Sequence, residues 1–375
     1  MRIYAHTNVP SPYRKHQFEL MAKAFPGSRF YFHMDQMGYR SWSNSLEDWP
    51  KGCCRCGLFV QLRDLLFQPW GTVHLLAGAS TNFFANLVFV LALQLSAAIG
   101  HSKVFSWNDA GFPDKIVRSR HSVFRMIARM SNRLFSAYSP GILGRKFTIA
   151  QGYSESRIVN CYFSHDVQRF CDYRRAHYDE DRKRIRTLLG IRDSSVSILN
   201  ISRYLECKRL GDLAQAFTWL EAHRPEVAAK CEFVLIGHGE HQEHLPMLEK
   251  LSLVKVHLVK TMPPDELLAY YCANDLFVFP SDGDIWGLVV NEALSMGLPV
   301  IVNEVIGSAE VVHDGKNGYR VPTHRPDAIA NRIAELVEDE SKRKQFAENA
   351  KTIEQYWRTE LGIEELKKYL AEEKI

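Results

Sequence analysis

Two cations and two carboxylates in the second half of the chain have types and spacings that suggest chemistry. Arg203 and Lys208 lie five positions apart in the segment SRYLECKRLGD. Asp284 and Glu292 lie eight positions apart in DIWGLVVNEALSMGLPVIV, which covers residues 284 to 302. A guanidinium forks onto phosphate oxygens and an ammonium adds a point charge, so the cation pair suits a diphosphate. A pair of solvated surface cations is the alternative interpretation.

The helix that carries Glu292 is expected to begin near Gly287, because a proline and two glycines interrupt the chain before it. The N–H groups of Gly287, Leu288 and Val289 then lie at a helix N-terminus, where partial positive charge favours an anion such as phosphate. Two carboxylates repel that anion, so we expect Asp284 and Glu292 to accept hydrogen bonds from hydroxyl groups on either side of a diphosphate. This pattern indicates a nucleotide sugar. The alternative is a helix cap at Asp284 and a paired core acid at Glu292.

The elements around these residues alternate between strands and helices. Five short β-rich runs precede residue 140, and a second series starts at Ser194, with helical patterns between the runs. Such alternation predicts an α/β protein with two Rossmann-like, doubly wound parallel-sheet domains. A chain of 375 residues also exceeds what one hydrophobic core usually organises. We expect an N-terminal domain over residues 1–168, a C-terminal domain over 169–355, and a last helix, about 356–375, that packs back on the first domain.

Ligands bind at the carboxyl ends of parallel strands, and each candidate residue follows a predicted strand. Gly237 and Gly239 follow the run FVLI and allow close approach of a ligand to the backbone. The segment lacks the third glycine of a dinucleotide fingerprint, which argues against NAD.

The composition excludes several classes of protein. A formal charge of +4 does not indicate nucleic-acid binding, and the N-terminus has no apolar core of a signal peptide. Eight scattered cysteines are typical of reduced thiols in the cytoplasm, and no second Cys or His pair follows CCRC at zinc-site spacing. The apolar segment 83–100 is shorter than the roughly 20 residues that cross a membrane. We therefore expect it to be a helix buried against a parallel sheet.

The C-terminal half resembles family 4 of the retaining GT-B glycosyltransferases over roughly residues 195 to 322. Asp284 to Val300 is similar to the family pattern E-G-F-G-L-x-x-x-E-A-x-A-x-G-x-P-V, and ISRYLECKRLGD is similar to G-R-L-x-x-x-K-G. VIGSAEVVHDGKNGYRV resembles a third family segment, with matches at Gly307, Glu310, Asp314, Asn317 and Gly318. The chain departs from the family at Asp284, where glutamate is usual, at Ile306, where glycine is common, and at FSWNDAG, where a histidine is frequent.

The resemblance implies a retaining, metal-independent transfer of a sugar from a nucleotide sugar, with no further cofactor. Arg203, Lys208 and the amides that follow Trp286 are expected to stabilise the leaving diphosphate. Trp286 itself is also expected among the residues that bind the nucleotide. Asp284 is placed on the sugar and Glu292 on the ribose. The base is expected near Met262 in KTMPPDE, and UDP is favoured over GDP on family frequency. The sequence DGD at 282–284 falls on the sugar-contact position and not in a metal-binding context.

The acceptor is assigned to the N-terminal domain, where Pro12 and Arg14 follow the first strand. Asn108 is expected to contact a sugar hydroxyl, and Asp109 is the candidate if a carboxylate acts as a nucleophile. Basic residues at helical spacing in 115–133 indicate either contact with an anionic inner membrane or a helix with solvated arginines.

These residues predict a hexosyltransferase that acts on a glycan or lipid-diphosphate-linked saccharide in the synthesis of cell-surface polysaccharide or lipopolysaccharide. The enzyme is expected in the cytoplasm, at or near the inner face of the membrane. A nucleotide-sugar epimerase on the same scaffold and a catalytically silent nucleotide-sugar-binding partner are the alternatives.

Overall fold

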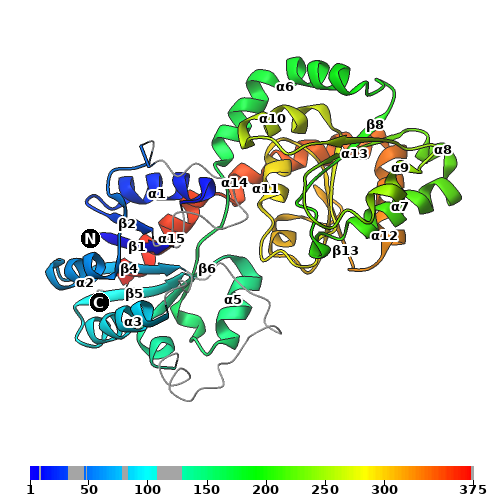
Figure 1. The fold of residues 1–375 in the computed structure, drawn as a ribbon. Coiled ribbons are helices and arrows are strands. Elements are labelled where there is room, and N and C mark those ends of the chain that lie inside the picture. Colours follow the sequence, from blue (N-terminus) through cyan, green and yellow to red (C-terminus); the bar gives the residue numbers. More distant parts are fainter. Residues whose placement is uncertain (8–9, 33–45, 48, 78–82, 108–128, 373–375) are drawn as a thin grey trace. The chain divides into compact units, whose positions relative to one another are not determined.

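The chain forms two compact units, each built around its own sheet (Figure 1). The computed structural model describes residues 1–7, 10–32, 46–47, 49–77, 83–107 and 129–372. The N-terminal unit comprises Met1–Phe163 and Thr359–Ile375, and the C-terminal unit comprises Ser164–Arg358. The predicted boundary at 168 and the observed boundary at 163 differ by five residues.

The N-terminal unit contains a parallel sheet of seven strands in the order β3-β2-β1-β4-β5-β6-β7. Its strands are β1 (Ile3–Thr7), β2 (Arg29–Phe32), β3 (Cys53–Arg55), β4 (Thr72–Ala77), β5 (Ser102–Trp107), β6 (Ser136–Ser139) and β7 (Ile158–Asn160). Its helices include α1 (Pro12–Ala24), α2 (Leu58–Phe67), α3 (Phe83–Ala98), α5 (Gly141–Ala150), the 3-10 helix η2 (Glu155–Arg157) and α15 (Thr359–Glu372). Phe18 of α1 and Leu366 of α15 share one core cluster, while Phe89 and Leu93 of α3 belong to another. The helices therefore cover both faces of the sheet.

The C-terminal unit contains a parallel sheet of six strands in the order β10-β9-β8-β11-β12-β13. Its strands are β8 (Val196–Ile201), β9 (Cys231–Ile236), β10 (Lys255–Val259), β11 (Leu276–Phe279), β12 (Val300–Asn303) and β13 (Gly318–Val321). Its helices are α6 (Val167–Leu189), α7 (Leu210–His223), α8 (Pro225–Ala228), α9 (Leu245–Glu249), α10 (Pro264–Ala273), α11 (Leu288–Ser295), α12 (Pro326–Glu338), α13 (Glu340–Ala350) and α14 (Ile353–Tyr356), with the 3-10 helices η3 (Glu206–Lys208) and η4 (Gly307–Val311). Every residue of β8, β9, β11 and β12 is buried, as expected for parallel strands covered on both faces. The predicted fold class is confirmed.

Helix α3 lies between β4 and β5 as predicted, but the expectation that it is buried is only half right. Phe89 and Leu93 are buried under the sheet, whereas Leu91 and Leu95 on the opposite side are exposed. The hydropathy of a segment does not show how many of its sides the fold covers. The exposed side of α3 could therefore not be predicted from the sequence. Within the described residues, no helix is long and apolar enough to cross a membrane.

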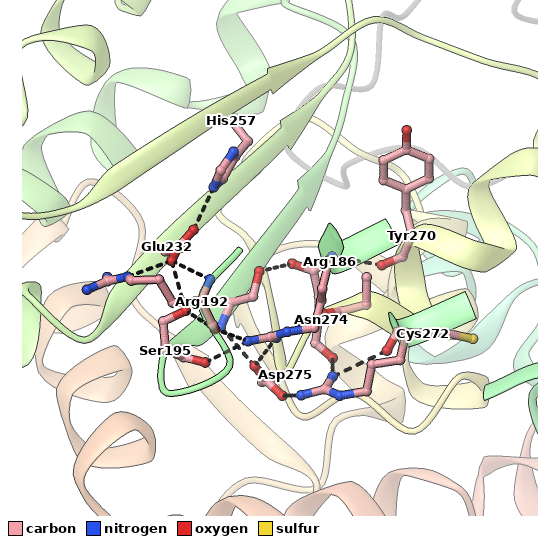
Figure 2. A network of polar contacts seen from close by, with 12 residues as sticks. Arg186, Arg192, Ser195, Glu232, His257, Tyr270, Cys272, Asn274 and Asp275 are labelled. Atoms are coloured by element: carbon pink, nitrogen blue, oxygen red, sulfur yellow. Dashed lines mark hydrogen bonds and ion pairs between the residues drawn. The ribbon is translucent and has the colours of Figure 1, made fainter. Parts of the chain in front are cut away.

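Glu232, the second residue of β9, carries a fully buried carboxylate (Figure 2). It accepts hydrogen bonds from Nε of Arg192 at 2.8 Å and from the hydroxyl of Ser195 at 3.0 Å, and it pairs with Nε2 of His257 at 2.7 Å. Burial alone raises the pKa of this carboxyl, but the hydrogen bonds from Arg192, His257 and Ser195 outweigh burial and lower it to about 2. Glu232 therefore ties the loop before β8 to β9 and β10.

A second acid, Asp275, directly precedes β11 and holds helix α6 against the amino-terminal ends of the strands. It accepts hydrogen bonds from the backbone N–H of Ser197 at 2.8 Å, from Arg182 at 2.6 Å and from Arg186 at 3.3 Å. Arg186 also donates to main-chain carbonyl groups, including that of Ala273 at 3.2 Å. Dense mixed charge on a helix is usually solvated. The structure instead pairs two of these charges with an acid that lies 89 or more positions further along the chain.

Replacing Glu232 by glutamine is expected to destabilise the C-terminal unit by at least about 2 kcal/mol at pH 7, because Arg192 and His257 lose a charged acceptor. The pKa of Glu232 is depressed in the folded state, so its contribution is present above about pH 4.5 and is lost as the pH falls toward 2. Urea unfolding between pH 7 and 3 measures this effect. Glu226→Gln, at an exposed acid, is the control. Equal stability of the Glu232 variant and the wild type at pH 7 contradicts the assignment.

Candidate functional site

The strand order of the second sheet reverses between β8 and β11, which are paired directly in parallel. In open α/β sheets, ligands bind outside the carboxyl ends of the strands at such a switch point. The segments that leave these two strands, residues 202–209 and 280–287, therefore define the candidate site. Both segments contain residues that the sequence predicts to bind a nucleotide sugar.

An ion pair joins the two segments. Nζ of Lys208 lies 2.5 Å from Oδ2 of Asp284, and the side chains are 11% and 22% exposed. The same ammonium lies 5.1 Å from the centroid of the Phe279 ring, at the end of β11. The fold thus brings together a cation and an acid that are 76 positions apart in the chain. An ammonium has three donors, so Lys208 can hold Asp284 and still donate to a phosphate oxygen.

The backbones of the two segments are in close contact. The amide of Asp282 and the hydroxyl of Ser281 both donate to the carbonyl oxygen of Cys207, at 3.0 Å and 2.8 Å. A Cβ at Gly283 would lie 2.4 Å from Cβ of Cys207, a distance that side chains do not tolerate. Glycine is therefore required at this position for the two segments to meet.

Arg209 and Asp282 form a further contact between the segments, and sequence reasoning missed both residues. Nε of Arg209 lies 3.6 Å from Oδ2 of Asp282, and the same guanidinium pairs with Asp212 at 3.1 Å. Nε2 of His324, after β13, lies 3.5 Å from Asp282. The signal for these residues was their position beside Lys208 and Asp284 at the same strand ends. Arg203, at the end of β8, is half-buried.

Helix α11 begins at Leu288, after Gly287 with a φ of +93°. A Cβ at Gly287 would lie 3.1 Å from both the Phe279 ring and Oγ of Ser308, so the left-handed conformation and the packing both favour glycine. The first N–H groups of a helix have no partner within the helix. Leu288 and Val289 supply two of these groups at the start of α11, which contacts β11. Ile306, where the family often has glycine, is buried against Gly287.

Glu292 lies in α11 and is buried, with 6% of its surface exposed. The hydroxyl of Tyr271, in α10, donates a hydrogen bond of 2.8 Å to its Oε2. Burial raises the pKa of Glu292 to about 7, although the Tyr271 hydrogen bond acts in the opposite direction. A carboxyl group in this environment titrates near neutral pH, which is the behaviour of many functional acids. Tyr271 was not predicted, because its contact with Glu292 joins two different helices.

Three residues that were predicted to bind the nucleotide have structural roles in the fold. Nε1 of Trp286 donates to Asn291 at 2.9 Å, and its buried indole stacks on Trp357 with ring centroids 5.0 Å apart. A Cβ at Gly237 would lie 1.9 Å from the carbonyl oxygen of Ser202, and one at Gly239 would lie 2.4 Å from that of Tyr204. These glycines therefore allow the segment after β9 to pack on the segment after β8. This packing is sufficient to explain them without a ligand.

Met262 is partly exposed in the loop that follows β10. Strand β10 is the edge strand, two positions from β8 in the sheet. With strands about 4.8 Å apart, this places the loop roughly 10 Å from the switch point. That separation is compatible with a nucleoside that extends from the diphosphate toward the sheet edge.

The N-terminal unit places the predicted acceptor residues at the start of α1. Pro12 is the first residue of this helix, and the guanidinium carbon of the buried Arg14 lies 3.9 Å from the centroid of the Trp107 ring. The strand order of this sheet also reverses, between β1 and β4. Asn108 and Asp109 lie outside the described residues, as does most of the basic segment 115–133. In the described parts of both units, no cluster of three or more potential metal ligands is present.

Residues 181–353 match the family described as Glycosyl transferases group 1. This part of the chain, just under half of its length, is similar to that family. The group 1 segment begins within α6 and ends in α14, so it includes the complete second sheet and all residues of the switch point. The predicted resemblance is confirmed for this unit.

Two curated relatives align with about half of the chain. The N-acetyl-alpha-D-glucosaminyl L-malate synthase of Bacillus anthracis is 27% identical over 185 residues, which are 49% of this chain and 47% of the relative. A D-inositol 3-phosphate glycosyltransferase of a Nocardioides species is 30% identical over 184 residues, which are 46% of this chain and 40% of the relative. The match thus spans less than half the length of each of these relatives.

The structure of HepE from Anabaena, solved in complex with UDP, has the same fold over the whole chain. It superposes with a TM-score of 0.71 at 17% identity and covers 99% of this chain and 100% of HepE. At this identity the similarity concerns the fold. The two-domain GT-B glycosyltransferase architecture predicted for this chain is thereby confirmed.

Proposed function

We propose that this protein is a retaining glycosyltransferase that moves a sugar from a nucleotide-diphosphate sugar, preferably a UDP-sugar, to a hydroxyl group of a glycan or lipid-linked saccharide. The observation that carries the proposal is the Lys208–Asp284 ion pair at the switch point of a group 1 unit. The name of the Nocardioides relative, a glycosyltransferase, supports sugar transfer, and the UDP complex of HepE supports the choice of donor class.

The donor's diphosphate is assigned to the end of β11. Lys208 and Arg203, which follow β8, and the amides of Leu288 and Val289, at the start of α11, are assigned to bind it. As the bond from the sugar to the diphosphate breaks, negative charge grows on the leaving oxygen. Fixed cations and N–H groups stabilise this charge without reorganising, so they lower the barrier. This set of donors serves the purpose without a metal ion.

The two carboxylates are assigned to hydroxyl groups of the donor. Oδ2 of Asp284 is engaged by Lys208, which leaves its other oxygen for a sugar hydroxyl. Asp284 reaches one methylene less far than the glutamate usual in the family, and its pairing with Lys208 fixes where the shorter side chain ends. Glu292, held by Tyr271, is assigned to the ribose. Retention then follows from attack of the acceptor on the same face that the diphosphate leaves, with the departing phosphate accepting the proton.

The binding site of the acceptor is assigned to the N-terminal unit, near Pro12 and Arg14. The acceptor itself is assigned to the lipid-linked saccharides found at the cytoplasmic face of a membrane. Synthesis of cell-surface polysaccharide or lipopolysaccharide is the process that this acceptor class implies.

A donor screen tests the proposal. The purified chain is incubated with UDP- and GDP-sugars, with and without a lipid-diphosphate-linked saccharide, and free nucleotide and glycosidic product are quantified. Acceptor-dependent release of UDP with formation of an α-linked product from an α-linked donor is expected. Turnover of the donor without any acceptor favours the epimerase, and binding without turnover favours a silent partner; either result overturns the proposal.

A further inference from the structure

Arg209 has a backbone conformation that residues other than glycine rarely adopt. Its φ is +55°, in the left-handed region. Over the residues that the structure describes, three non-glycine residues have a positive φ, and two of them, Arg209 and His324, lie in contact. Such strain persists only where the surrounding contacts maintain it, and it gathers at functional sites. The contacts of Arg209 must therefore stabilise a conformation that glycine would adopt without strain.

The conformation of Arg209 determines how Lys208 is presented. Arg209 is the single residue between η3, which ends at Lys208, and α7, which begins at Leu210. Its amide donates to the carbonyl oxygen of Glu206 at 3.0 Å, and its carbonyl oxygen accepts from the amide of Asp212 at 3.0 Å. Because no other residue lies between the two helices, the φ and ψ of Arg209 set the direction of η3, and hence of Lys208, relative to α7.

The guanidinium of Arg209 joins segments that leave three different strands. Its Nη2 lies 3.1 Å from Oδ1 of Asp212, at the start of α7, and also donates to Nδ1 of His324, which follows β13. Its Nε lies 3.6 Å from Oδ2 of Asp282, which follows β11. A guanidinium only donates, so Nδ1 of His324 accepts, and the proton of the neutral ring lies on Nε2, 3.5 Å from Asp282. Contacts from three segments thus hold one side chain, which explains how the strained backbone is maintained.

From these contacts we infer that Arg209 is a positioning residue for the donor site. It is adjacent to Lys208 in the chain, and its partner Asp282 lies two residues before Asp284. One guanidinium therefore fixes both segments next to the places from which the Lys208–Asp284 ion pair extends. Glycine would relieve the strain at this position but would leave the two segments without this link. The inference rests on the proposed function only for the ligand, which is the diphosphate and sugar of the donor.

Unfolding temperatures of alanine and glycine variants test the strain at Arg209. Both substitutions remove the guanidinium, but only alanine keeps a Cβ in the left-handed conformation, so Arg209→Ala is expected to unfold at a lower temperature than Arg209→Gly. Arg224 is the matched control. It also precedes a helix, α8, and pairs with an acid in the first turn of that helix, Glu226, but its φ is an ordinary −140°. At Arg224 the order should reverse, because glycine loses more entropy on folding. An Arg209→Ala variant at least as stable as Arg209→Gly contradicts the inference.

Kinetics and nucleotide binding test the positioning role on the full chain. Arg209→Gly is expected to lower kcat for sugar transfer by about 10–100-fold at saturating donor, because Lys208 and Asp284 are no longer held in place. It should also weaken the binding of UDP, or of GDP where GDP binds more tightly, by about tenfold. The unfolding temperature should stay close to that of the wild type, since relief of strain offsets the lost contacts. Arg209→Lys should recover part of both functional losses, because an ammonium can still pair with Asp282, and Arg224→Gly should leave kcat and binding unchanged.

A double-variant cycle tests whether Arg209 acts through Asp282. Asp282→Asn alone is expected to lower kcat to a similar extent, and the addition of Arg209→Gly should cause little further loss, because both substitutions cut the same link. Losses that multiply in the double variant overturn the inference, as do wild-type kcat and nucleotide affinity in Arg209→Gly. Failure of the proposed function is distinguishable from these results, because the wild type itself then transfers no sugar. In that case the nucleotide affinities of the same variants, measured by calorimetry, still test the positioning role.

Discussion

Replacement of Lys208 by methionine is expected to lower the rate of sugar transfer by about 10²–10³-fold, the usual cost of removing one fixed donor to a developing negative charge. Methionine retains much of the length of the side chain and its contact with Phe279 but removes the ammonium. The substitution also releases Asp284, which loses its ion-pair partner. We therefore expect both the leaving group and the sugar-binding acid to be affected, with the larger loss in kcat. Initial rates at saturating donor measure the effect.

Lys342→Met is the matched control for this prediction. Lys342 pairs with Glu335 at 2.8 Å in the same unit, but it lies in α13, outside the two segments that leave β8 and β11. Loss of this exposed pair should alter stability by less than about 1 kcal/mol and leave transfer unchanged. If Lys208→Met retains wild-type kcat, Lys208 does not act on the leaving diphosphate.

Replacement of Glu292 by glutamine is expected to have opposite effects on donor binding and on stability. The donor loses a charge-assisted hydrogen bond to its ribose, which should raise the KM for the donor by about 10–100-fold. The folded protein, however, no longer has to bury a carboxylate. The Glu292→Gln variant should therefore bind donor poorly and still unfold at a higher temperature than the wild type at pH 8.

The pH dependence of stability follows from the raised pKa of Glu292. Because the pKa is about 7 in the folded state and 4.5 unfolded, the folded state of the wild type holds the proton more tightly. The associated stability is present below pH 4.5 and is lost as the pH rises through 7, by about 3 kcal/mol in total. The stability of Glu292→Gln relative to wild type should accordingly increase over this range. Thermal unfolding between pH 5 and 8 measures it.

Tyr271→Phe separates a role in donor binding from a purely structural role of Glu292. Loss of the Tyr271 hydroxyl removes the hydrogen bond that lowers the pKa of Glu292. The pH at which donor binding reaches its maximum should then move upward, while Glu292→Gln should show no such titration. A pH profile of the donor KM that is the same in wild type and Tyr271→Phe contradicts the assignment of Glu292 to the ribose.

The sequence was informative about the second unit for two physical reasons. Parallel strands covered on both faces consist of continuous apolar runs, so β8, β9, β11 and β12 were recognisable without their partners. Ligand-binding residues then follow from topology, because they must leave the carboxyl ends of the strands. Lys208 and Asp284 were placed at neighbouring strand ends in this way, and the structure brings them together in an ion pair.

The remaining features depend on contacts that no local pattern contains. Tyr271 was missed because its hydrogen bond to Glu292 links two helices. The close packing of Gly237 and Gly239 on the segment after β8 was missed because that contact is not local. The exposed side of α3 was missed for a related reason. The sequence of an apolar helix has the same hydropathy whether the fold covers one side of the helix or all of its sides.

Calorimetric titration of nucleoside diphosphate into the full chain tests the central claim, that the switch point of the C-terminal unit binds the diphosphate of a nucleotide sugar. UDP is titrated first, with GDP as the comparison, into wild type, Lys208→Met and Lys342→Met. We predict that the preferred nucleotide binds the Lys208 variant at least about tenfold more weakly than the wild type, a loss of about 1.4 kcal/mol, and binds the Lys342 variant unchanged. Equal affinity of all three proteins would contradict the claim.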